Sequence, residues 1–144
     1  MRGMRIARRF HFDAAHLLGY HDGKCRRLHG HAYRLELVLT GEPRPPRPTD
    51  PQSGFVADFG LLGAIVQGEL IDPLLDHRHL NESLPSIPYT STEYLAAWIM
   101  GWCLRHLEGR PELGGARMES VRVWESANAW AEALRADALT VDPA

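Results

Sequence analysis

Three histidines near the beginning of the chain have the type and spacing of metal ligands. His29 and His31 flank Gly30, and His16 precedes them. In a β-strand, residues two apart project to the same face, so His29 and His31 would point the same way. Catalytic zinc is usually held by three protein ligands and keeps a fourth position open. The pattern therefore predicts an open zinc site on His16, His29 and His31, although zinc hydrolases share such a ligand set.

Cys25 lies just before the histidine pair in a basic stretch, beside Lys24, Arg26 and Arg27. Positive neighbours and a nearby zinc ion would favour the thiolate, which could act as a base. The alternative is that Cys25 is a fourth zinc ligand that closes the site, and the sequence leaves both open. Cys103, the only other cysteine, falls in an apolar helical pattern and is expected in the core.

Two further places carry acidic groups with possible roles. In the pair Asp76-His77, the carboxylate could orient the imidazole and support its protonated form, provided that the backbone there is irregular. The alternative is an ordinary polar loop. Glu125 shares a strand face with Val121 and Val123, where its carboxylate could grip the adjacent N–H groups of a guanine-like or pterin ring. The alternative is an exposed glutamate at a strand end.

Alternating apolar residues predict the strands that position these groups. Strands over 6–16 and 28–40 would carry the three histidines in apolar rows. Adjacent antiparallel strands lie about 5 Å apart, so the imidazoles can converge. The proline-rich stretch 41–54 is expected to be a loop, followed by a short strand over 55–57 that pairs back on the second strand. The last strand is expected over 120–125.

Two helices are expected between the third and fourth strands. Asp58 is a candidate N-cap for the first, which would end near Pro73. The stretch 90–93 offers a capping box for the second, whose buried stripe would be Leu95, Trp98, Ile99, Trp102 and His106. This order predicts an α+β fold with a four-stranded antiparallel sheet and two helices on one face.

Composition limits the class of protein. The chain has 144 residues, 44% of them hydrophobic, and a formal net charge of -2, which suits a single domain over 1–144. Such a balance supplies no broad basic field, so we expect no nucleic-acid partner. Without an apolar run near the ~20 residues of a membrane span, or a signal-peptide core, we expect a cytoplasmic protein without membrane contact. Uncovered sheet edges favour a homo-oligomer.

Together these stretches resemble the 6-pyruvoyl- and 6-carboxytetrahydropterin synthase family, over most of the chain from Phe10 to about Glu125. A cysteine with only three residues before His29-Gly30-His31 is similar to the bacterial carboxy branch, since the pyruvoyl branch usually places its cysteine farther upstream. The stretches that carry the resemblance are Phe-Asp-Ala-Ala-His at 12–16, Cys-Arg-Arg-Leu-His-Gly-His-Ala-Tyr at 25–33, Val-Ala-Asp-Phe at 56–59, Leu-Asp-His-Arg-His-Leu-Asn at 75–81 and Val-Arg-Val-Trp-Glu-Ser at 121–126.

The resemblance implies a tunnelling fold, in which subunits join their sheets into a barrel and two trimers stack as a homohexamer. Active sites would lie at subunit interfaces. It also implies Zn²⁺ on the three histidines and a proton-transfer set of Cys25, Asp76 and His77, contributed by different subunits. Glu125 would anchor the pterin.

The implied activity is that of a zinc-dependent lyase that converts 7,8-dihydroneopterin triphosphate to 6-carboxy-5,6,7,8-tetrahydropterin for 7-deazapurine and queuosine biosynthesis. Acetaldehyde and triphosphate would be released. Two alternatives stay open: a 6-pyruvoyltetrahydropterin synthase, which keeps the three-carbon side chain, and a zinc- and pterin-binding protein without turnover. The sequence departs from the family pattern at 90–94 and at Gly63, where a lysine is usual.

Overall fold

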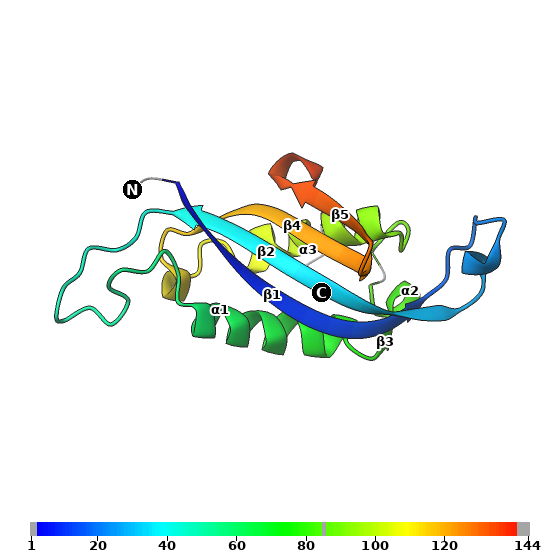
Figure 1. The fold of residues 1–144 in the computed structure, drawn as a ribbon, viewed down its shortest axis with the longest axis horizontal. Helices are drawn as coiled ribbons and strands as arrows, with labels where there is room; N and C mark the ends of the chain where they lie inside the picture. The colour runs from blue at the N-terminus through cyan, green and yellow to red at the C-terminus, as the bar shows by residue number, and fades with distance from the viewer. Residues whose placement is uncertain (1–2, 85, 141–144) are drawn as a thin grey trace.

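One mixed sheet of five strands forms the centre of the molecule. The computed structural model describes residues 3–84 and 86–140. Within them the strand order is β3-β1-β2-β4-β5. In Figure 1, α1 runs alongside β1 while α3 lies behind β4. The strands are β1 (Met4–His16), β2 (His29–Gly41), β3 (Arg78–His79), β4 (Arg117–Ser126) and β5 (Ala129–Leu134).

The hairpin of β1 and β2 is the longest pairing and carries the candidate ligands. Its antiparallel register runs without a break from Met4 opposite Gly41 to His16 opposite His29. Alternate side chains face the helices, so that Phe10, Phe12 and Tyr33 are buried while their neighbours in sequence are exposed. The predicted alternation is thus observed, and the inner face of the hairpin forms one side of the core.

The α+β class is confirmed, whereas the predicted four-stranded antiparallel sheet is wrong in number and direction. β3 pairs parallel to β1 at Ala14 and Ala15, and β5 adds an antiparallel edge next to β4. Two residues are too few for a strand pattern to be recognised in β3. Three of the six residues in β5 are alanine, which favours strands little, so its signal was weak.

The expected strand over 55–57 does not form. Arg44 and Phe55 are joined by one backbone hydrogen bond of 3.0 Å across the proline-rich loop, but the segment enters no ladder. Instead, β4 pairs with β2 from Thr40 to Arg34 and occupies the edge that residues 55–57 were expected to use. A ten-residue strand buries more apolar surface against the helices than three residues can, which explains the outcome.

Helix α1 (Phe59–Val66) begins as predicted, because the Asp58 side chain accepts hydrogen bonds from two backbone N–H groups of the first turn. The helical run ends at Leu75, two residues past Pro73 and thus near the predicted end, but its second part is not α-helical. The chain continues as a π-helix over Gln67–Leu75, and the N–H of Asp76 donates to the carbonyl of Ile71 at 2.8 Å. The wider turn changes which carbonyl faces the proline ring, which lets the helix pass Pro73. Asp76, which follows this helix, therefore lies at the edge of β1, where its side chain accepts a hydrogen bond from the N–H of Asp13.

The short helix α2 (Leu80–Ser83) leads to α3 (Thr92–His106). The N-cap of α3 is Ser91, whose side chain accepts from the N–H of Tyr94. The predicted capping box is therefore wrong, since Tyr94 rather than Glu93 lies three residues after the cap. The predicted stripe is buried except for His106, which is partly exposed in the last turn.

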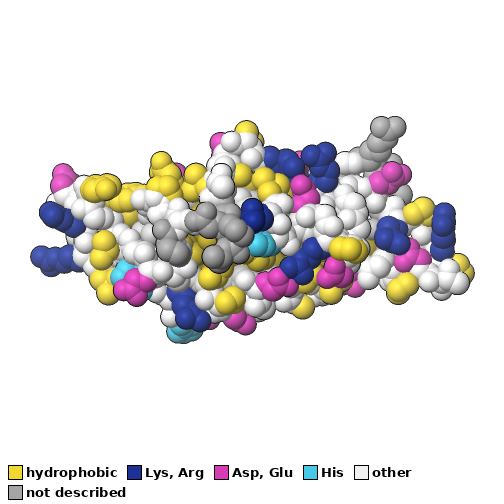
Figure 2. Space-filling model, turned by 180° about the vertical axis from the view of Figure 1, so that it is seen from behind, with side chains coloured by type: hydrophobic (Ala, Val, Ile, Leu, Met, Phe, Trp, Pro, Cys, Tyr) yellow, Lys and Arg dark blue, Asp and Glu magenta, His cyan; other side chains and the backbone are white. Residues whose placement is uncertain are grey.

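The surface behind the view of Figure 1 mixes acidic, basic and apolar side chains. Figure 2 shows Lys and Arg interspersed with Asp and Glu over this face. Such mixing gives little long-range field of either sign on the face drawn there. No helix among the described residues combines the length and the hydropathy that crossing a membrane requires.

Candidate functional site

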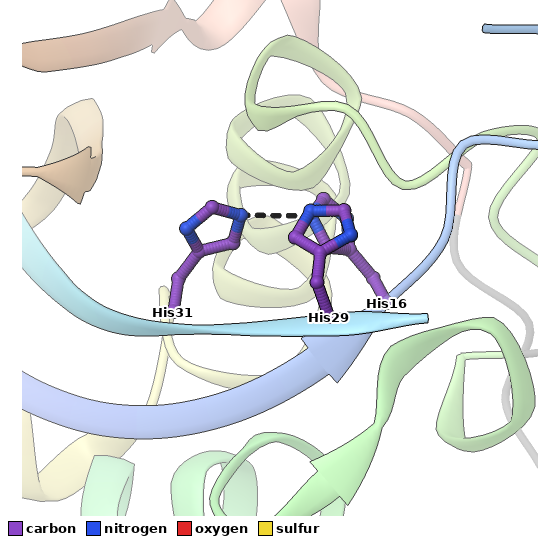
Figure 3. Close-up of side chains that lie close together, drawn as sticks. All are labelled: His16, His29 and His31. Atoms are coloured by element: carbon purple, nitrogen blue, oxygen red, sulfur yellow. Dashed lines mark hydrogen bonds between the residues drawn. The ribbon is translucent and has the colours of Figure 1, made fainter. Parts of the chain in front are cut away.

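Three imidazoles converge where β1 ends and β2 begins. His16 and His29 are direct partners in the sheet register, and His31 lies two residues further along β2 on the same face. Figure 3 shows the three rings turned toward one another. One ligand nitrogen from each ring lies within 4.8 Å of the others, and His16 is fully buried. The structure thus brings together the three residues that the sequence pattern selected.

Backbone carbonyls fix the orientation of two rings. The Nδ1 atoms of His16 and His29 lie 2.8 Å from the carbonyl of Thr90 and 2.7 Å from that of Arg27. A carbonyl can only accept, so each Nδ1 carries the proton and each Nε2 keeps a free lone pair. His29 Nε2 is buried without a hydrogen-bond partner, and His16 Nε2 lies 3.1 Å from His31 Nε2. One buried nitrogen without a partner, beside two Nε2 atoms that face each other, fits a divalent metal ion.

The electrostatics of the triad favour the form that binds metal. Burial lowers the pKa of both His16 and His31, and repulsion from His29 lowers it further, although Glu125 opposes the shift. A neutral imidazole is the ligand form, since a protonated ring has no free lone pair. Burial therefore keeps His16 and His31 in the form that can bind a metal at neutral pH.

Glu125 lies at the open side of this triad. Its Oε1 is 3.4 Å from His31 Nε2, and its side chain keeps about a third of its exposure. Among the described residues, β2 pairs with β4 only from Arg34 onward, so the edge of β2 beside the histidines is open. A hollow of about 610 Å³ lies there, lined among others by His31, Tyr33 and Glu125. One candidate metal ligand, His31, and the carboxylate of Glu125 thus share one cavity at the edge of the triad.

Tyr33 was missed as a polar group because it continues the apolar row of β2. Its ring stacks on Phe12 with centroids 4.9 Å apart and meets the His31 ring at 5.4 Å. The hydroxyl is buried without a partner, and burial raises the pKa of this hydroxyl, with a further contribution from Glu125. A tyrosine in a row otherwise made of leucines was the only signal in the sequence.

Asp76 and His77 form a hydrogen-bonded pair with an irregular backbone. Asp76 Oδ2 lies 2.9 Å from His77 Nδ1. His77 has a φ of 55°, in the left-handed region that is uncommon for residues other than glycine. This turn lets two residues that are adjacent in sequence face each other. The carboxylate raises the pKa of His77, while hydrogen bonds from the Asp13 backbone and from His77 lower the pKa of Asp76.

Cys25 lies in a 3-10 turn, Lys24–Arg26, within the loop that joins β1 to β2. Its carbonyl accepts a hydrogen bond of 2.9 Å from the N–H of Leu18, and its side chain is partly buried. In Figure 1 this loop extends beyond the end of the sheet. Within the described part of the chain, the ligand group at the triad consists of the three histidines alone. One subunit therefore does not form the alternative with Cys25 as fourth ligand.

Thr90 and Asn81 support the triad and were not identified from sequence. The Thr90 carbonyl orients His16, as described above. The Asn81 side chain accepts from the N–H of Leu17 at 3.0 Å and donates to its carbonyl at 3.1 Å, which fixes the residue after His16. In the sequence Thr90 belonged to the predicted capping box and to a departure from the family pattern. A backbone carbonyl acts through its position, which the residue type does not reveal.

The sequence matches known pterin enzymes over most of its length. A family model described as 6-pyruvoyl tetrahydropterin synthase matches residues 5–136. A 6-carboxy-5,6,7,8-tetrahydropterin synthase of Synechocystis sp. is 38% identical over 84% of this chain and 85% of its own. The enzyme of that name in Haemophilus influenzae is 31% identical over 89% and 96%. A dihydroneopterin monophosphate aldolase of Pyrococcus furiosus is 32% identical over 84% and 89%.

Solved structures agree with this assignment at the level of the fold. The 6-pyruvoyl tetrahydropterin synthase of Caenorhabditis elegans superposes with a TM-score of 0.71 at 24% identity, covering 93% of this chain and 98% of its own. A variant of the Plasmodium vivax enzyme gives a TM-score of 0.65 at 19% identity, covering 92% and 98%. The chain is thus homologous to the 6-carboxy-5,6,7,8-tetrahydropterin synthases, which are lyases, and it belongs to the 6-pyruvoyl tetrahydropterin synthase family.

Proposed function

We propose that the chain is a zinc-dependent 6-carboxytetrahydropterin synthase. It would convert 7,8-dihydroneopterin triphosphate to 6-carboxy-5,6,7,8-tetrahydropterin with release of acetaldehyde and triphosphate, as a step toward 7-deazapurines and queuosine. The observation that carries the proposal is the convergence of three imidazoles beside Glu125, which lies 3.4 Å from His31 and lines a hollow together with it. Two relatives above 30% identity bear the name of this activity.

Glu125 would hold the ring of the substrate. Adjacent N–H groups on a pterin match the two oxygens of one carboxylate, which gives orientation as well as affinity. Since Glu125 lies 3.4 Å from His31, a ring anchored there would extend its side chain over the triad. The site would therefore position the side-chain hydroxyls at the metal and the ring at the carboxylate.

His16, His29 and His31 would hold the zinc ion, since three imidazoles with an open side suit this metal. When bound, zinc would lower the pKa of the substrate hydroxyls and stabilise the negative charge that develops on them. The carbonyls of Thr90 and Arg27 would keep the rings in the ligating tautomer.

Cys25, Asp76 and His77 would move the protons. Asp76 fixes the His77 ring and stabilises its protonated form, so His77 can take up and return a proton. Neither Cys25 nor this pair belongs to the imidazole cluster of the same chain. We propose that a neighbouring subunit completes each site, in a homo-oligomer arranged as a dimer of trimers whose joined sheets form the barrel.

One departure from the family pattern has a local explanation. A Cβ atom at Gly63 would lie 2.5 Å from the guanidinium of Arg8, which fills the space beside α1. A lysine at position 63 would need Arg8 to move, so this chain places its cation on β1 instead of the helix. The choice of the carboxy branch rests on the position of Cys25 and on the relatives named above.

Product analysis tests the proposal. The zinc-loaded protein is incubated with 7,8-dihydroneopterin triphosphate, and acetaldehyde, triphosphate and the pterin product are measured. We expect equal amounts of acetaldehyde and 6-carboxytetrahydropterin. A pyruvoyl product without acetaldehyde would assign the chain to the other branch. Turnover of the monophosphate alone would favour the activity named for the Pyrococcus furiosus relative, and tight pterin binding without any product would indicate a binding protein.

A further inference from the structure

Asp13 forms a third member of the cluster around His77. One ligand atom from each of Asp13, Asp76 and His77 lies within 4.8 Å of the other two. Asp13 belongs to the Phe-Asp-Ala-Ala-His stretch, of which the proposed function uses only the histidine. Because Phe12 and Ala14 are buried on the inner face, the exposed Asp13 side chain lies on the outer face of the sheet. It therefore projects to the other face of β1 from His16, although Asp13 and His31 line the same two hollows.

The backbone of Asp13 holds both partners of the pair. Its N–H donates to Asp76 Oδ1 at 3.0 Å, and its carbonyl accepts from the N–H of His77 at 2.6 Å. Just beyond, β3 pairs with β1 at Ala14 and Ala15. The left-handed backbone of His77 is a conformation that needs such external bonds to persist. One residue of β1 thus fixes the position of the carboxylate and the backbone of the imidazole.

The charges that face His77 come from three elements. Asp13 lies on β1, Asp76 precedes His77, and Arg78 and His79 of β3 line the same hollow of about 550 Å³. Asp76 bonds directly to His77 Nδ1, and the Asp13 charge also favours the protonated ring. His77 is well exposed in the single chain, so water weakens this second effect.

We propose that Asp13 is a positioning residue for proton transfer, whose backbone clamps the Asp76–His77 pair and whose carboxylate is a second acidic partner of the imidazole. This inference rests on the proposed role of His77. If Asp13 has this role, His77 is protonated when the reaction begins and can act as the proton donor. Removing the Asp13 charge alone, with the backbone bonds intact, would make the ring lose its proton at a lower pH.

The test compares Asp13→Asn with Asp13→Glu and with Asp50→Asn. Asparagine removes the charge, glutamate keeps it, and Asp50 lies in the loop at the opposite end of the sheet, which makes it a matched control (Figure 1). The titration of His77 is followed by NMR of protein with ¹⁵N-labelled histidine, and the pH profile of turnover is recorded in parallel. His77→Gln identifies the resonance.

We expect Asp13→Asn to shift the midpoint of the His77 titration to lower pH. The limb of the turnover pH profile that follows this titration should shift in the same direction. Both shifts should be smaller than those caused by Asp76→Asn. Asp13→Glu and Asp50→Asn should stay close to the wild type. A His77 titration in Asp13→Asn that coincides with the wild type would overturn the inference, even if pterin turnover is found. Absence of turnover in the wild type would instead refute the proposed function, while the NMR comparison still decides the role of Asp13. If Asp13→Asn does not fold, Asp13→Ser supplies the same comparison.

Discussion

The histidine triad and the Asp76–His77 pair use the same side chain in opposite environments. At the triad, burial lowers the pKa of His16 and His31 and keeps the rings neutral. At the pair, a carboxylate raises the pKa of an exposed His77. The first setting suits a ligand that must offer a lone pair, and the second suits a group that must carry a proton. Environment, rather than residue type, assigns the two roles.

The backbone that carries each group differs as well. The triad stands on two regular strands in unbroken register, with carbonyls of neighbouring segments fixing its rings. The pair follows a π-helix and includes a left-handed residue that is held by bonds to Asp13. One chain therefore brings the three imidazoles together by itself, whereas the Asp76–His77 pair faces outward. This arrangement fits the proposal that the pair acts on the site of a neighbouring subunit.

Loss of one imidazole of the triad should have the largest effect, because it removes a metal ligand and should leave the Asp76–His77 pair unchanged. We expect His16→Ala to weaken zinc binding by more than about 100-fold, beyond the 10–100-fold that loss of an outer-shell partner costs, and turnover should fall with it. Metal content after dialysis, measured by mass spectrometry, checks this. His11→Ala is the matched control, because His11 is an exposed histidine of the same strand. Stoichiometric zinc in His16→Ala would remove the triad as the metal site.

Replacing Asp76 should separate catalysis from metal binding. We expect Asp76→Asn to lower kcat by about 100- to 10,000-fold, the usual contribution of general acid–base catalysis, while zinc content stays unchanged. Cys25→Ala should give the same pattern if both residues serve proton transfer. Steady-state kinetics with the zinc-loaded protein provide the measurement. An Asp76→Asn variant of normal kcat would show that the pair is only structural.

Glu125 should affect affinity rather than the metal. Glu125→Gln keeps the shape of the side chain but removes its charge, and we expect pterin binding to weaken by about 10- to 100-fold, as for loss of a charged hydrogen bond. Calorimetric titration with a dihydropterin gives the dissociation constant. Glu119→Gln, on the same strand but in a surface ion pair with Arg5, should bind normally. Equal affinities of the two variants would refute the anchor.

The smallest expected effect is an opposite pH response of the two regions in metal-free protein. Folding lowers the pKa of His16 and His31 from the ordinary histidine value of 6.5, so just below pH 6.5 the unfolded chain binds more protons than the folded chain. The stability that these two residues contribute at higher pH is therefore lost as the pH falls below 6.5. The raised pKa of His77 contributes stability below 6.5 that disappears as pH rises. Urea unfolding across pH 5 to 8 measures the sum, and Asp76→Asn should remove only the second contribution. An unchanged pH dependence in that variant would contradict this division.

Short-range patterns accounted for much of the fold. Alternation of apolar residues predicted the long hairpin, and Asp58 predicted the start of α1, because side-chain direction and capping depend on neighbouring residues only. The same patterns failed for β3 and β5, and they did not predict that the helix becomes π-helical before Pro73. In those places the structure depends on which distant segment covers an edge or accepts a wider helical turn.

The sequence by itself determined the family, the α+β class and the residues that could do chemistry. Spacing in a strand decides that His29 and His31 share a face, and no distant contact is needed for it. Only the tertiary structure decided that Thr90 orients His16, that Asp13 clamps Asp76 and His77, and that Cys25 stays outside the triad of its own chain. The first two relations join segments far apart in sequence, so they exist only once the sheet and helices have packed.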